Sequence, residues 1–481
     1  MKLLSFPGAR RTWSCVLSQL LLAWALTACG GAPGAGGPAQ GEAFAPADAE
    51  LQSASASSTE TGDSSPPSPE TEDEPGAGQP DPSAPADTTP PPTEPDPTEP
   101  APIPGDPPPP PAPPSPSEPP APPAPPTPVL RSFSPAQTVL NLHKPFGGAA
   151  VGPQGQLVVP DLTYNRVLVY TSWPTSPNQA PSFELPARAP IHVAVHGERL
   201  LVVEHFGHRV AIYNRFPTDA SALPDVMVGQ PDKVSDKPTL GRAGLFLPRS
   251  ATITPQGQLI VADTGSHRVL VWNTVPQRDG QEASLVLGQA DFAHVRFNDD
   301  NQDNQMEERP TARTMNYPSG VWSDGRRLVV SDSYNNRVLV WTAMPQSSFQ
   351  PADLVLGQQG FELAAPNDTD GDGQSDAVGA NTLGRAEGAV ASDGTRLALT
   401  DTYNHRVLVW NSFPERNGQP ADLVLGQPDF IHSGANTNPV GFHDHSIAPW
   451  GLHTPIGLQF VGEALLVTDH SNNRLQLFAP Q

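Results

Sequence analysis

A ten-residue stretch that recurs six times is the strongest constraint on how this chain can fold. In its clearest copy, residues 401–410, Asp401 is followed by small and polar residues, and Arg406 then begins an apolar run. In every copy the acid stands five residues before the arginine. The six pairs are Asp161–Arg166, Glu204–Arg209, Asp263–Arg268, Asp332–Arg337, Asp401–Arg406 and Asp469–Arg474. Such a repeat predicts an architecture in which equivalent units pack side by side.

Each repeat has room for four short strands. Successive arginines are separated by 43, 59, 69, 69 and 68 residues. In the fifth unit we expect strands at 386–391, 396–400, 406–411 and 421–426, with turn residues such as Asp393-Gly394 between them. Six copies of four antiparallel strands predict an all-β fold, a six-bladed β-propeller over residues 130–481.

The two ends of the repeat array complement each other. The sixth unit ends at 474–479 without a fourth strand, whereas Ala136–Leu142 aligns with the fourth strand of the fifth unit. We expect this N-terminal segment to cross over and supply the outer strand of the last blade. Such closure removes the strand edges that an open array would expose.

Residues 1–28 are typical of a secretory signal peptide, with a basic start and a short apolar run at 16–26. The sequence Leu-Thr-Ala-Cys-Gly that ends at Gly30 resembles the lipobox of bacterial lipoproteins, so it implies export and a lipid anchor at Cys29. Glycine after that cysteine favours the outer membrane or cell surface. The alternative is an ordinary signal with an incidental cysteine. Because the other cysteine, Cys15, lies in the signal, the mature chain has no possible internal disulfide.

Residues 29–129 form an acidic, proline-rich segment. It has sixteen Asp and Glu between Glu42 and Glu118, and no Lys or Arg occurs between Arg11 and Arg131. Such a composition buries too little apolar surface to fold, so we expect a disordered, extended stalk. A ligand for a proline-recognising domain is the alternative, although the segment has no compact motif for one.

The stalk also carries most of the charge. The net charge of −23 divides into +3 for the signal, −16 for the stalk and −10 for residues 131–481. No basic run or basic aromatic patch interrupts the folded part. This argues against nucleic acid or an anionic lipid surface as a partner, so membrane contact is expected through the lipid anchor alone.

The repeats resemble the NHL family, in its bacterial subgroup with the sequence Leu-Val-Leu-Gly-Gln-Pro-Asp-Phe between blades. That sequence stands intact at 423–430, with near copies at 285–292, 354–361 and 226–232. The resemblance covers residues 136–481 and implies a propeller. It leaves function open, because NHL propellers include protein-binding, RNA-binding and catalytic members.

We interpret the acid–arginine pairs as structural, since a motif repeated six times lacks the asymmetry of a binding site. The same holds for His208, His267 and His405, which share one slot with asparagines of the other repeats. They are expected to be turn residues.

Residues that break the repeat near the channel axis are better candidates for a site. At the starts of the first strands, His192, Arg249 and Glu387 differ most from their counterparts. We expect them to converge on one mouth of the central channel. The alternative is a channel filled by mutually satisfied polar side chains.

Two metal hypotheses involve histidine. The peptidyl-amidating lyases are similar propellers that bind zinc through three histidines, and His192 occupies a comparable place. His143 and His453 do not match the other two positions. A second weak candidate is the loop cluster His443-Asp444-His445, with His432 nearby.

The most specific chemical motif spans residues 368–376 and predicts calcium binding. Alternating oxygen ligands separated by glycines can wrap around a hard cation. The candidate ligands are Asp368, Asp370, Asp372, Gln374 and Asp376. The loop resembles those of EF-hands, dockerins and thrombospondin type 3 repeats, although Gly379 stands where an EF-hand has its bidentate glutamate. A solvated acidic turn is the alternative, and the irregular stretch 298–303 is a poorer candidate.

These observations favour a lipid-anchored, monomeric binding or scaffold module for an envelope protein or a glycan. The long inserts 296–314, 362–382 and 431–452 would form its recognition face. No catalytic residue is identified. The alternative is a metal-dependent lyase or hydrolase whose site lies in the central channel.

Overall fold

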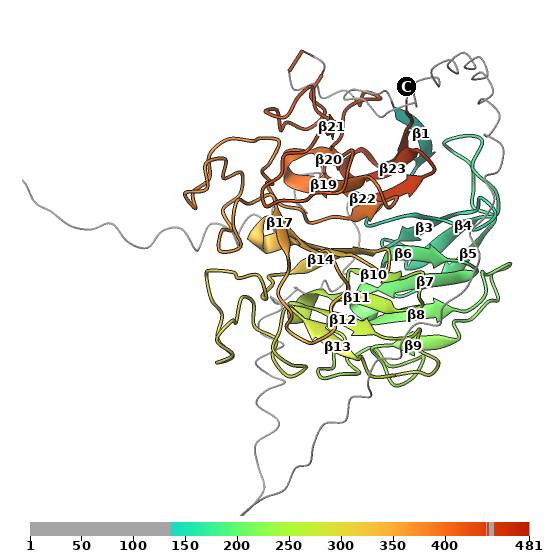
Figure 1. Cartoon of the computed structure of the whole chain (residues 1–481). Coiled ribbons are helices and arrows are strands. Elements are labelled where there is room, and N and C mark those ends of the chain that lie inside the picture. Colours follow the sequence, from blue (N-terminus) through green and yellow to red (C-terminus); the bar gives the residue numbers. More distant parts are fainter. Residues whose placement is uncertain (1–135, 439, 442–446, 481) are drawn as a thin grey trace, which may run out of the picture. The chain divides into compact units, whose positions relative to one another are not determined.

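The computed structural model describes residues 136–480 except 439 and 442–446. The expected signal peptide, Cys29, the stalk at 29–129 and the cluster His443–His445 lie outside the described residues. Within the described part, all regular structure is β-strand or three-residue 3-10 helix (Figure 1). None of the helices there has the length and hydrophobicity needed to cross a membrane.

The strands form six four-stranded antiparallel sheets, one for each repeat. The sheets are arranged as a β-propeller, as the repeat predicted. Its first three blades are β2 (Ala150–Val151), β3 (Leu157–Asp161), β4 (Arg166–Tyr170) and β5 (Phe183–Pro186); β6 (Pro190–His196), β7 (Arg199–Glu204), β8 (Arg209–Tyr213) and β9 (Val226–Val228); and β10 (Ser250–Ile253), β11 (Leu259–Asp263), β12 (Arg268–Trp272) and β13 (Leu285–Leu287).

The last three blades repeat this order, and the sixth borrows a strand from the N-terminal end. They are β14 (Pro318–Ser323), β15 (Leu328–Asp332), β16 (Arg337–Trp341) and β17 (Leu354–Leu356); β18 (Val390–Ser392), β19 (Leu397–Asp401), β20 (Arg406–Trp410) and β21 (Leu423–Leu425); and β22 (Pro455–Val461), β23 (Ala464–Asp469), β24 (Arg474–Phe478) and β1 (Ala136–Asn141).

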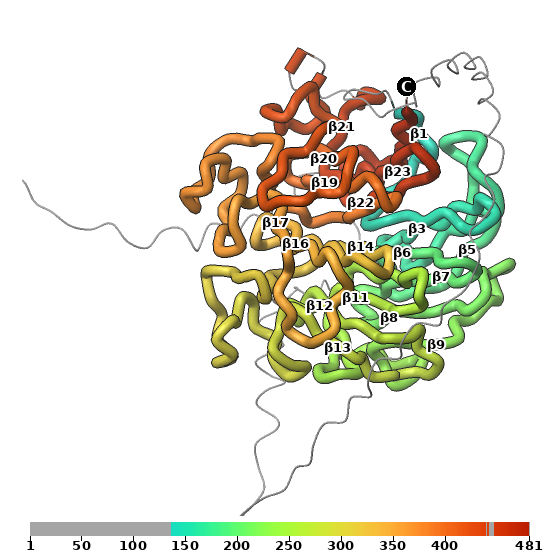
Figure 2. Tube along the Cα trace, viewed as in Figure 1, coloured from blue at the N-terminus to red at the C-terminus, as the bar shows by residue number. Residues whose placement is uncertain are grey.

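The pairing of β1 with β24 confirms the expected crossover. The two strands are antiparallel, with Ala136 opposite Phe478 and Asn141 opposite Arg474. In the tube trace the blue-green N-terminal strand lies beside the red C-terminal blade (Figure 2). Leu140, 1% exposed, and Leu475, fully buried, belong to one apolar cluster with residues of the first blade. The crossover therefore joins the last blade to the first.

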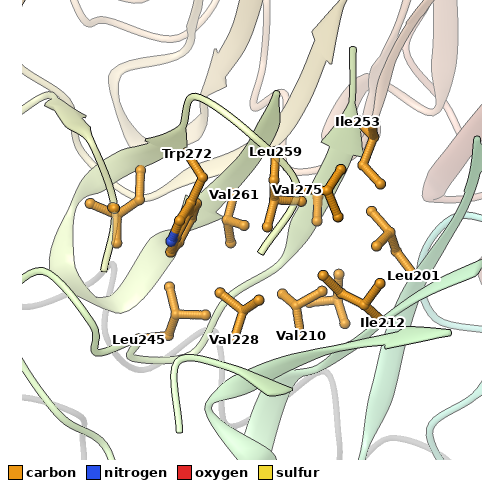
Figure 3. Close-up of a cluster of buried hydrophobic side chains, with 14 of the residues drawn as sticks. Leu201, Val210, Ile212, Val228, Leu245, Ile253, Leu259, Val261, Trp272 and Val275 are labelled. Carbon is orange, nitrogen blue, oxygen red and sulfur yellow. The ribbon is translucent and has the colours of Figure 1, made fainter. Parts of the chain in front are cut away.

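The core lies between neighbouring blades. One cluster combines Leu201 and Val210 of the second blade with Leu259, Val261 and Trp272 of the third (Figure 3). The second and third strands of each blade are apolar at consecutive positions because both of their faces are covered by adjacent blades. The packing explains why these strands read as unbroken apolar runs in the sequence.

The first strand of the fifth blade is shorter than predicted. The expectation was 386–391, whereas β18 begins at Val390. A Cβ on Gly388 would lie 2.0 Å from Thr400 Oγ1 and 2.9 Å from the carbonyl oxygen of Ile456. The chain before β18 is therefore pressed against the next blade, a close approach that only glycine permits. The fourth strand, expected at 421–426, is likewise limited to β21.

In blades three to six the acid–arginine pair ties a turn to the loop that enters the blade. In the fourth blade Asp332 Oδ2 accepts from Arg337 Nε at 2.7 Å, and Asp332 Oδ1 accepts from the backbone N–H of Asn316 at 2.6 Å. Arg337 Nη2 donates to the carbonyl oxygens of Thr311 and Thr314. Both charged side chains are fully buried. Charge-assisted bonds of this kind give the pair a structural role.

In five of the six blades the residue after the acid bonds the next blade. Its hydroxyl or imidazole bonds the backbone carbonyl at the start of the following blade in five of the six junctions, namely His205 to Pro248, Thr264 to Pro318, Ser333 to Ala386, Thr402 to Pro455 and His470 to Pro145. The exception is the first blade, where the apolar Leu162 occupies the slot. The junction between the first and second blades therefore lacks this bond.

The three turn histidines adopt left-handed backbone geometry, with φ of 51–53°. Their Nδ1 atoms accept backbone N–H groups of the next blade, His208 from Leu247, His267 from Tyr317 and His405 from Thr454. Burial lowers the pKa of His208 and of His267 to about 4. These rings are thus neutral acceptors in turns.

Candidate functional site at the channel mouth

The turns between the second and third strands lie at the same blade edge as the loops that join successive blades. This follows from the antiparallel order within each sheet, in which these two kinds of connection leave the same edge. We call this side the upper face. It carries all the long inserts and the starts of the first strands.

Arg249 and Glu387 meet on the upper face although 138 residues separate them. Arg249 Nη1 donates to Glu387 Oε1 at 3.0 Å, and the two side chains are 11% and 15% exposed. The Arg249 guanidinium also lies 5.5 Å from the ring centre of Phe146 and 5.2 Å from that of Tyr317. Side chains from the first, third, fourth and fifth blades thus converge here.

A second arginine extends this group. The Arg385 guanidinium lies 3.7 Å from the ring centre of Tyr334 and 5.2 Å from that of Tyr403, and its Nε is 3.8 Å from Glu387 Oε2. The rings of Tyr334 and Tyr317 are stacked with their centres 4.5 Å apart. We refer to Phe146, Arg249, Tyr317, Tyr334, Arg385, Glu387 and Tyr403 as the mouth cluster.

Sequence reasoning missed Arg385 and the three tyrosines. The signal was present for two of them, because Tyr334 and Tyr403 stand two residues after the acid of their repeats. The same slot holds Phe206 in the second repeat, and small residues in the other three. All three aromatic side chains are prominently exposed, at 37%, 46% and 46% for Tyr334, Tyr403 and Phe206. An aromatic residue at this turn position could therefore have identified Tyr334 and Tyr403 as candidate site residues from the sequence.

The mouth cluster has surplus positive charge. Burial raises the pKa of Tyr334 to about 12 and also raises the pKa of Tyr403, so both phenols are neutral at pH 7. Two guanidinium groups then face the single carboxylate of Glu387. The Nε atoms of Arg249 and Arg385 are buried without a hydrogen-bond partner. Surplus positive charge beside exposed aromatic rings suits an oxygen-rich or anionic ligand.

His192 does not join this group. Its ring lies against Gly148, where a Cβ would be 2.9 Å from Cδ2, and no contact with Arg249 or Glu387 is seen among the described residues. Burial lowers its pKa to about 4, and its buried Nδ1 has no hydrogen-bond partner. Two of the three residues expected at one mouth therefore meet, and the third packs against the first blade.

Glycines let the first strands of neighbouring blades approach closely near the slot of His192. Its counterparts in four other blades are glycines, which let the first strands approach one another: a Cβ on Gly320 would lie 2.7 Å from the carbonyl oxygen of Gly388, and one on Gly457 would lie 2.3 Å from that of Gly147. Blades with glycine at this slot crowd together near the axis. The backbone before His192 is also close to the first blade, because a Cβ on Gly147 would lie 1.3 Å from the carbonyl oxygen of Ile191.

The histidines named for zinc are not gathered at His192. His143 contacts Tyr164 with ring centres 5.7 Å apart, and His453 contacts His405 at 5.1 Å. His432 Nδ1 pairs with Asp429 at 2.6 Å. Within the described residues, one group of three neighbouring metal-ligating side chains occurs, and it contains no histidine.

That group lies in the acidic loop. Carboxylate oxygens of Asp368, Asp370 and Asp376 all lie within 4.8 Å of one another. Asp368 is 1% exposed and accepts from the backbone N–H groups of Gly371 and Gly373. The other two candidates bond each other, with Gln374 Nε2 donating to Asp372 Oδ2 at 3.0 Å. Three of the five predicted ligands are thus gathered by the fold.

The acidic stretch of the preceding insert is a copy of this loop. Asp299, also 1% exposed, accepts from the N–H of Asn304 as Asp368 accepts from Gly373. Gln302 and Asn304 have positive φ like Gly371 and Gly373, which stand 69 residues later. The turn is therefore shared, but within the described residues only the loop 368–376 gathers three carboxylates, so the stretch 298–303 stays the poorer candidate. Asparagine and glutamine had replaced the glycines and obscured a shared turn.

Comparison with known proteins agrees with this architecture. A six-bladed ring of four-stranded repeats defines the chain as a β-propeller. Residues 247–272 match the family model described as NHL repeat. The chain is thus a β-propeller in which residues 247–272 form an NHL repeat. A search of curated proteins gives no match.

Solved structures with similar arrangement are distant. A streptogramin B lyase is 10% identical with a TM-score of 0.37, and the match covers 72% of this chain and 97% of that one. Virginiamycin B lyase from Staphylococcus aureus is 12% identical with a TM-score of 0.35, covering 71% and 98%. Kuenenia stuttgartiensis hydrazine synthase is 14% identical with a TM-score of 0.38, covering 70% and 96%. Similarity at this level says nothing about the activity of this chain.

Proposed function

We propose that this protein is a lipid-anchored binding module that recognises an envelope protein or glycan at its mouth cluster. The observation that carries the proposal is the gathering of Arg249, Arg385, Glu387 and four aromatic rings where the repeats differ. Residues shared by all blades serve the fold, so residues that depart from the repeat are available for recognition.

The chemistry of the cluster favours a ligand with oxygen acceptors and a flat or apolar face. Arginine presents a planar fork of donors to carboxylate, hydroxyl or carbonyl oxygens. The half-exposed rings of Tyr334 and Tyr403 add contact area at little cost in conformational entropy. Both sugars and extended peptides offer this combination.

Binding of labelled envelope glycans and solubilised envelope proteins to the full chain tests the proposal. Tyr334→Ala and Tyr403→Ala alter exposed side chains and are expected to weaken binding about tenfold or more. Tyr164→Ala, at a 55% exposed tyrosine of the first blade outside the cluster, is the matched control. Equal binding by all three variants contradicts a site at the mouth.

Anchoring is a separate part of the proposal and rests on the lipobox-like sequence at Cys29. Cys29→Ser is expected to move the protein from the membrane fraction to the soluble exported fraction. A labelled lipid precursor should be incorporated by the wild type alone. If Cys29→Ser stays in the membrane fraction without incorporating the labelled lipid, the protein is not held at the membrane by a lipid on Cys29.

We further propose that the loop 368–376 binds calcium through Asp368, Asp370 and Asp376 and thereby stiffens the insert beside the mouth. Extracellular calcium concentrations suit even weak oxygen-ligand sites. The alternative, a metal-dependent lyase or hydrolase, would need several ligands beside His192, and within the described residues no group of three metal-ligating side chains includes it.

A further inference from the structure

The second blade has an open pocket where four other blades are covered by their own chain. The pocket has a volume of about 720 Å³, and Arg188, Glu204, Phe206, Arg209, Leu223 and Lys233 are among the residues that line it. This volume falls within the range of about 300–1,000 Å³ typical of ligand sites. The pocket adjoins the junction between the first and second blades, which also lacks the hydroxyl or imidazole bond found at the others.

The pocket exists because one connecting loop is short. Only residues 187–189 join β5 to β6, whereas residues 229–249 and 288–317 form the next two connections. In blades three to six the longer loop crosses the acid–arginine pair. The second blade keeps the pair, Glu204 and Arg209 at 2.6 Å, but has no such loop over it.

The missing loop leaves one edge of Arg209 without acceptors. In blades three to six, Nη2 of the repeat arginine donates to two carbonyl oxygens of the loop, which belong to Gly241 and Gly244, Thr311 and Thr314, Gly379 and Thr382, and Ala448 and Gly451. Arg209 keeps its Nε bond to Glu204 and its Nη1 bonds to the carbonyl oxygens of Lys233 and Ser235. For its Nη2, no bond occurs within the described part of the chain.

From this contrast we infer that the pocket binds an extended acidic peptide segment of a partner protein. The peptide would take the place of the absent loop, and its carbonyl or carboxylate oxygens would accept from Arg209 Nη2. In four blades a stretch of polypeptide already fills the equivalent place. An extended polypeptide segment is therefore the ligand that best fits the pocket.

Charge supports the acidic character of the peptide. The lining carries Arg188, Arg209 and Lys233 against one carboxylate, that of Glu204. Arg188 pairs with Asp236 at the pocket edge, and Lys233 Nζ lies 3.8 Å from Asp279 Oδ2, so both cations are held in place and their charges are offset by these aspartates. Residues 131–481 as a whole have a net charge of −10. The donor that remains open to a ligand is the Nη2 edge of the Arg209 guanidinium, and a carboxylate is a stronger acceptor for it than a neutral carbonyl.

Apolar side chains supply the remaining contacts. Leu223 is 75% exposed and Phe206 is 46% exposed, and both line the pocket. Met227 and Tyr213, which are almost fully buried, form part of the wall. Successive side chains of an extended peptide point in opposite directions. A peptide in which apolar and acidic residues alternate would therefore place its apolar side chains on the apolar wall and its carboxylates on the cationic side chains of the pocket.

Fluorescence anisotropy with the full chain tests this inference. The probe is a fluorescein-labelled hexapeptide of alternating leucine and glutamate, and its leucine–glutamine counterpart is the charge control. The acidic peptide is expected to bind about tenfold more tightly than the neutral one. Equal affinity for the two peptides would overturn the inference, as would preferential binding of oligogalacturonate, a carboxylate-bearing glycan.

Variants locate the binding. Lys233→Glu and Leu223→Ser change exposed side chains and are each expected to weaken acidic-peptide binding about tenfold. Arg278→Glu makes the same charge change at an exposed arginine outside the pocket and should bind as the wild type does. Arg209→Lys removes the free Nη2 while keeping a cation for Glu204, and its melting temperature shows whether the blade stays intact.

The mouth cluster serves as an independent reference. Tyr403→Ala is expected to leave peptide binding unchanged, since Tyr403 does not line the pocket. Loss of peptide binding in Tyr403→Ala, with normal binding in Lys233→Glu and Leu223→Ser, would place the peptide at the mouth and refute the pocket. These variants therefore test the mouth cluster and the pocket of the second blade independently of each other.

Discussion

The ring of His470 in the last blade bonds the carbonyl oxygen of Pro145 at the start of the first, with 2.6 Å between Nδ1 and the oxygen. Since a carbonyl only accepts, Nδ1 must carry the proton. The same two blades are joined at their outer edge by β1, which lies on β24. Closure therefore rests on a polar contact near the axis and on a strand at the rim.

Loss of packing under β1 should destabilise the whole domain. Leu140 is 1% exposed, and Leu140→Ala is expected to cost about 2–5 kcal/mol of unfolding free energy, measured by urea denaturation. Gln137→Ala alters an exposed residue of the same strand and is the control. Deletion of 132–142 should lower the melting temperature further. An unchanged transition in both the deletion and Leu140→Ala would contradict strand closure.

The acid–arginine pairs should differ in their contribution to stability according to burial. Arg337 and Asp332 are fully buried, so Arg337→Ala leaves an uncompensated carboxylate and is expected to cost about 3–5 kcal/mol. The equivalent Arg166 is 34% exposed, and Arg166→Ala should cost about 1 kcal/mol or less. Chemical denaturation of the two variants measures the difference. Similar losses would show that burial does not govern these pairs.

The Arg249–Glu387 pair can be separated from its neighbours by a double-mutant cycle. Arg249→Met and Glu387→Gln each remove the partner of a charged side chain that is only 15% or 11% exposed, so each single change is expected to destabilise the protein. The double variant is expected to lose less stability than the sum of the two single losses, because no unpaired charge remains in it. Thermal unfolding of the four proteins gives the coupling. Strict additivity would mean that the two charges do not interact.

The propeller architecture could be predicted from the sequence because the same structural unit is repeated six times. Even the crossover of Ala136–Asn141 could be predicted, since the sixth repeat lacks a strand that an isolated N-terminal segment matches. The bounds of β18 could not. They depend on how closely Gly388 approaches Ile456 in the next blade, a contact between residues far apart in the chain.

The candidate site was less accessible for the same reason. Arg249 and Glu387 stood out as departures from the repeat, but their pairing across two blades needed the ring to be closed. His192 departed from the repeat equally and faces a different neighbour, Gly148. Sequence departures thus identify which residues are free of the structural pattern. They do not say which of these residues meet.

Stability should fall with acidification because buried histidines resist protonation. Burial lowers the pKa of His267 from 6.5 to about 4, so the unfolded chain takes up the proton first as the pH falls below 6.5. The resulting loss grows until about pH 4 and then levels off. A shift of this size corresponds to at most about 3 kcal/mol.

His267→Asn should reduce this pH dependence while preserving stability at pH 7. Asparagine is suited to the turn, since Asn473 has the same backbone geometry and its Oδ1 accepts the equivalent N–H, that of Lys144. His143→Asn, at an exposed histidine, is the control. Urea denaturation at pH 7, 5.5 and 4.5 measures the effect. An unaltered pH profile in His267→Asn would show that the ring is not held neutral.

Calcium binding should depend on the carboxylates that the fold brings together. Asp370 belongs to the group whose oxygens lie within 4.8 Å, together with Asp368 and Asp376. Isothermal titration of the wild type with calcium is expected to give saturable heat that Asp370→Ala abolishes, because a hard cation needs several charged oxygens at once. Glu308→Ala removes an exposed acid outside the loop and should titrate normally.

Because the insert also supplies the carbonyl oxygens of Gly379 and Thr382 to Arg406, bound calcium should raise the melting temperature of the wild type and leave that of Asp370→Ala unchanged. Equal heats in wild type and Asp370→Ala would mean that the loop is held by its own backbone hydrogen bonds and binds no calcium.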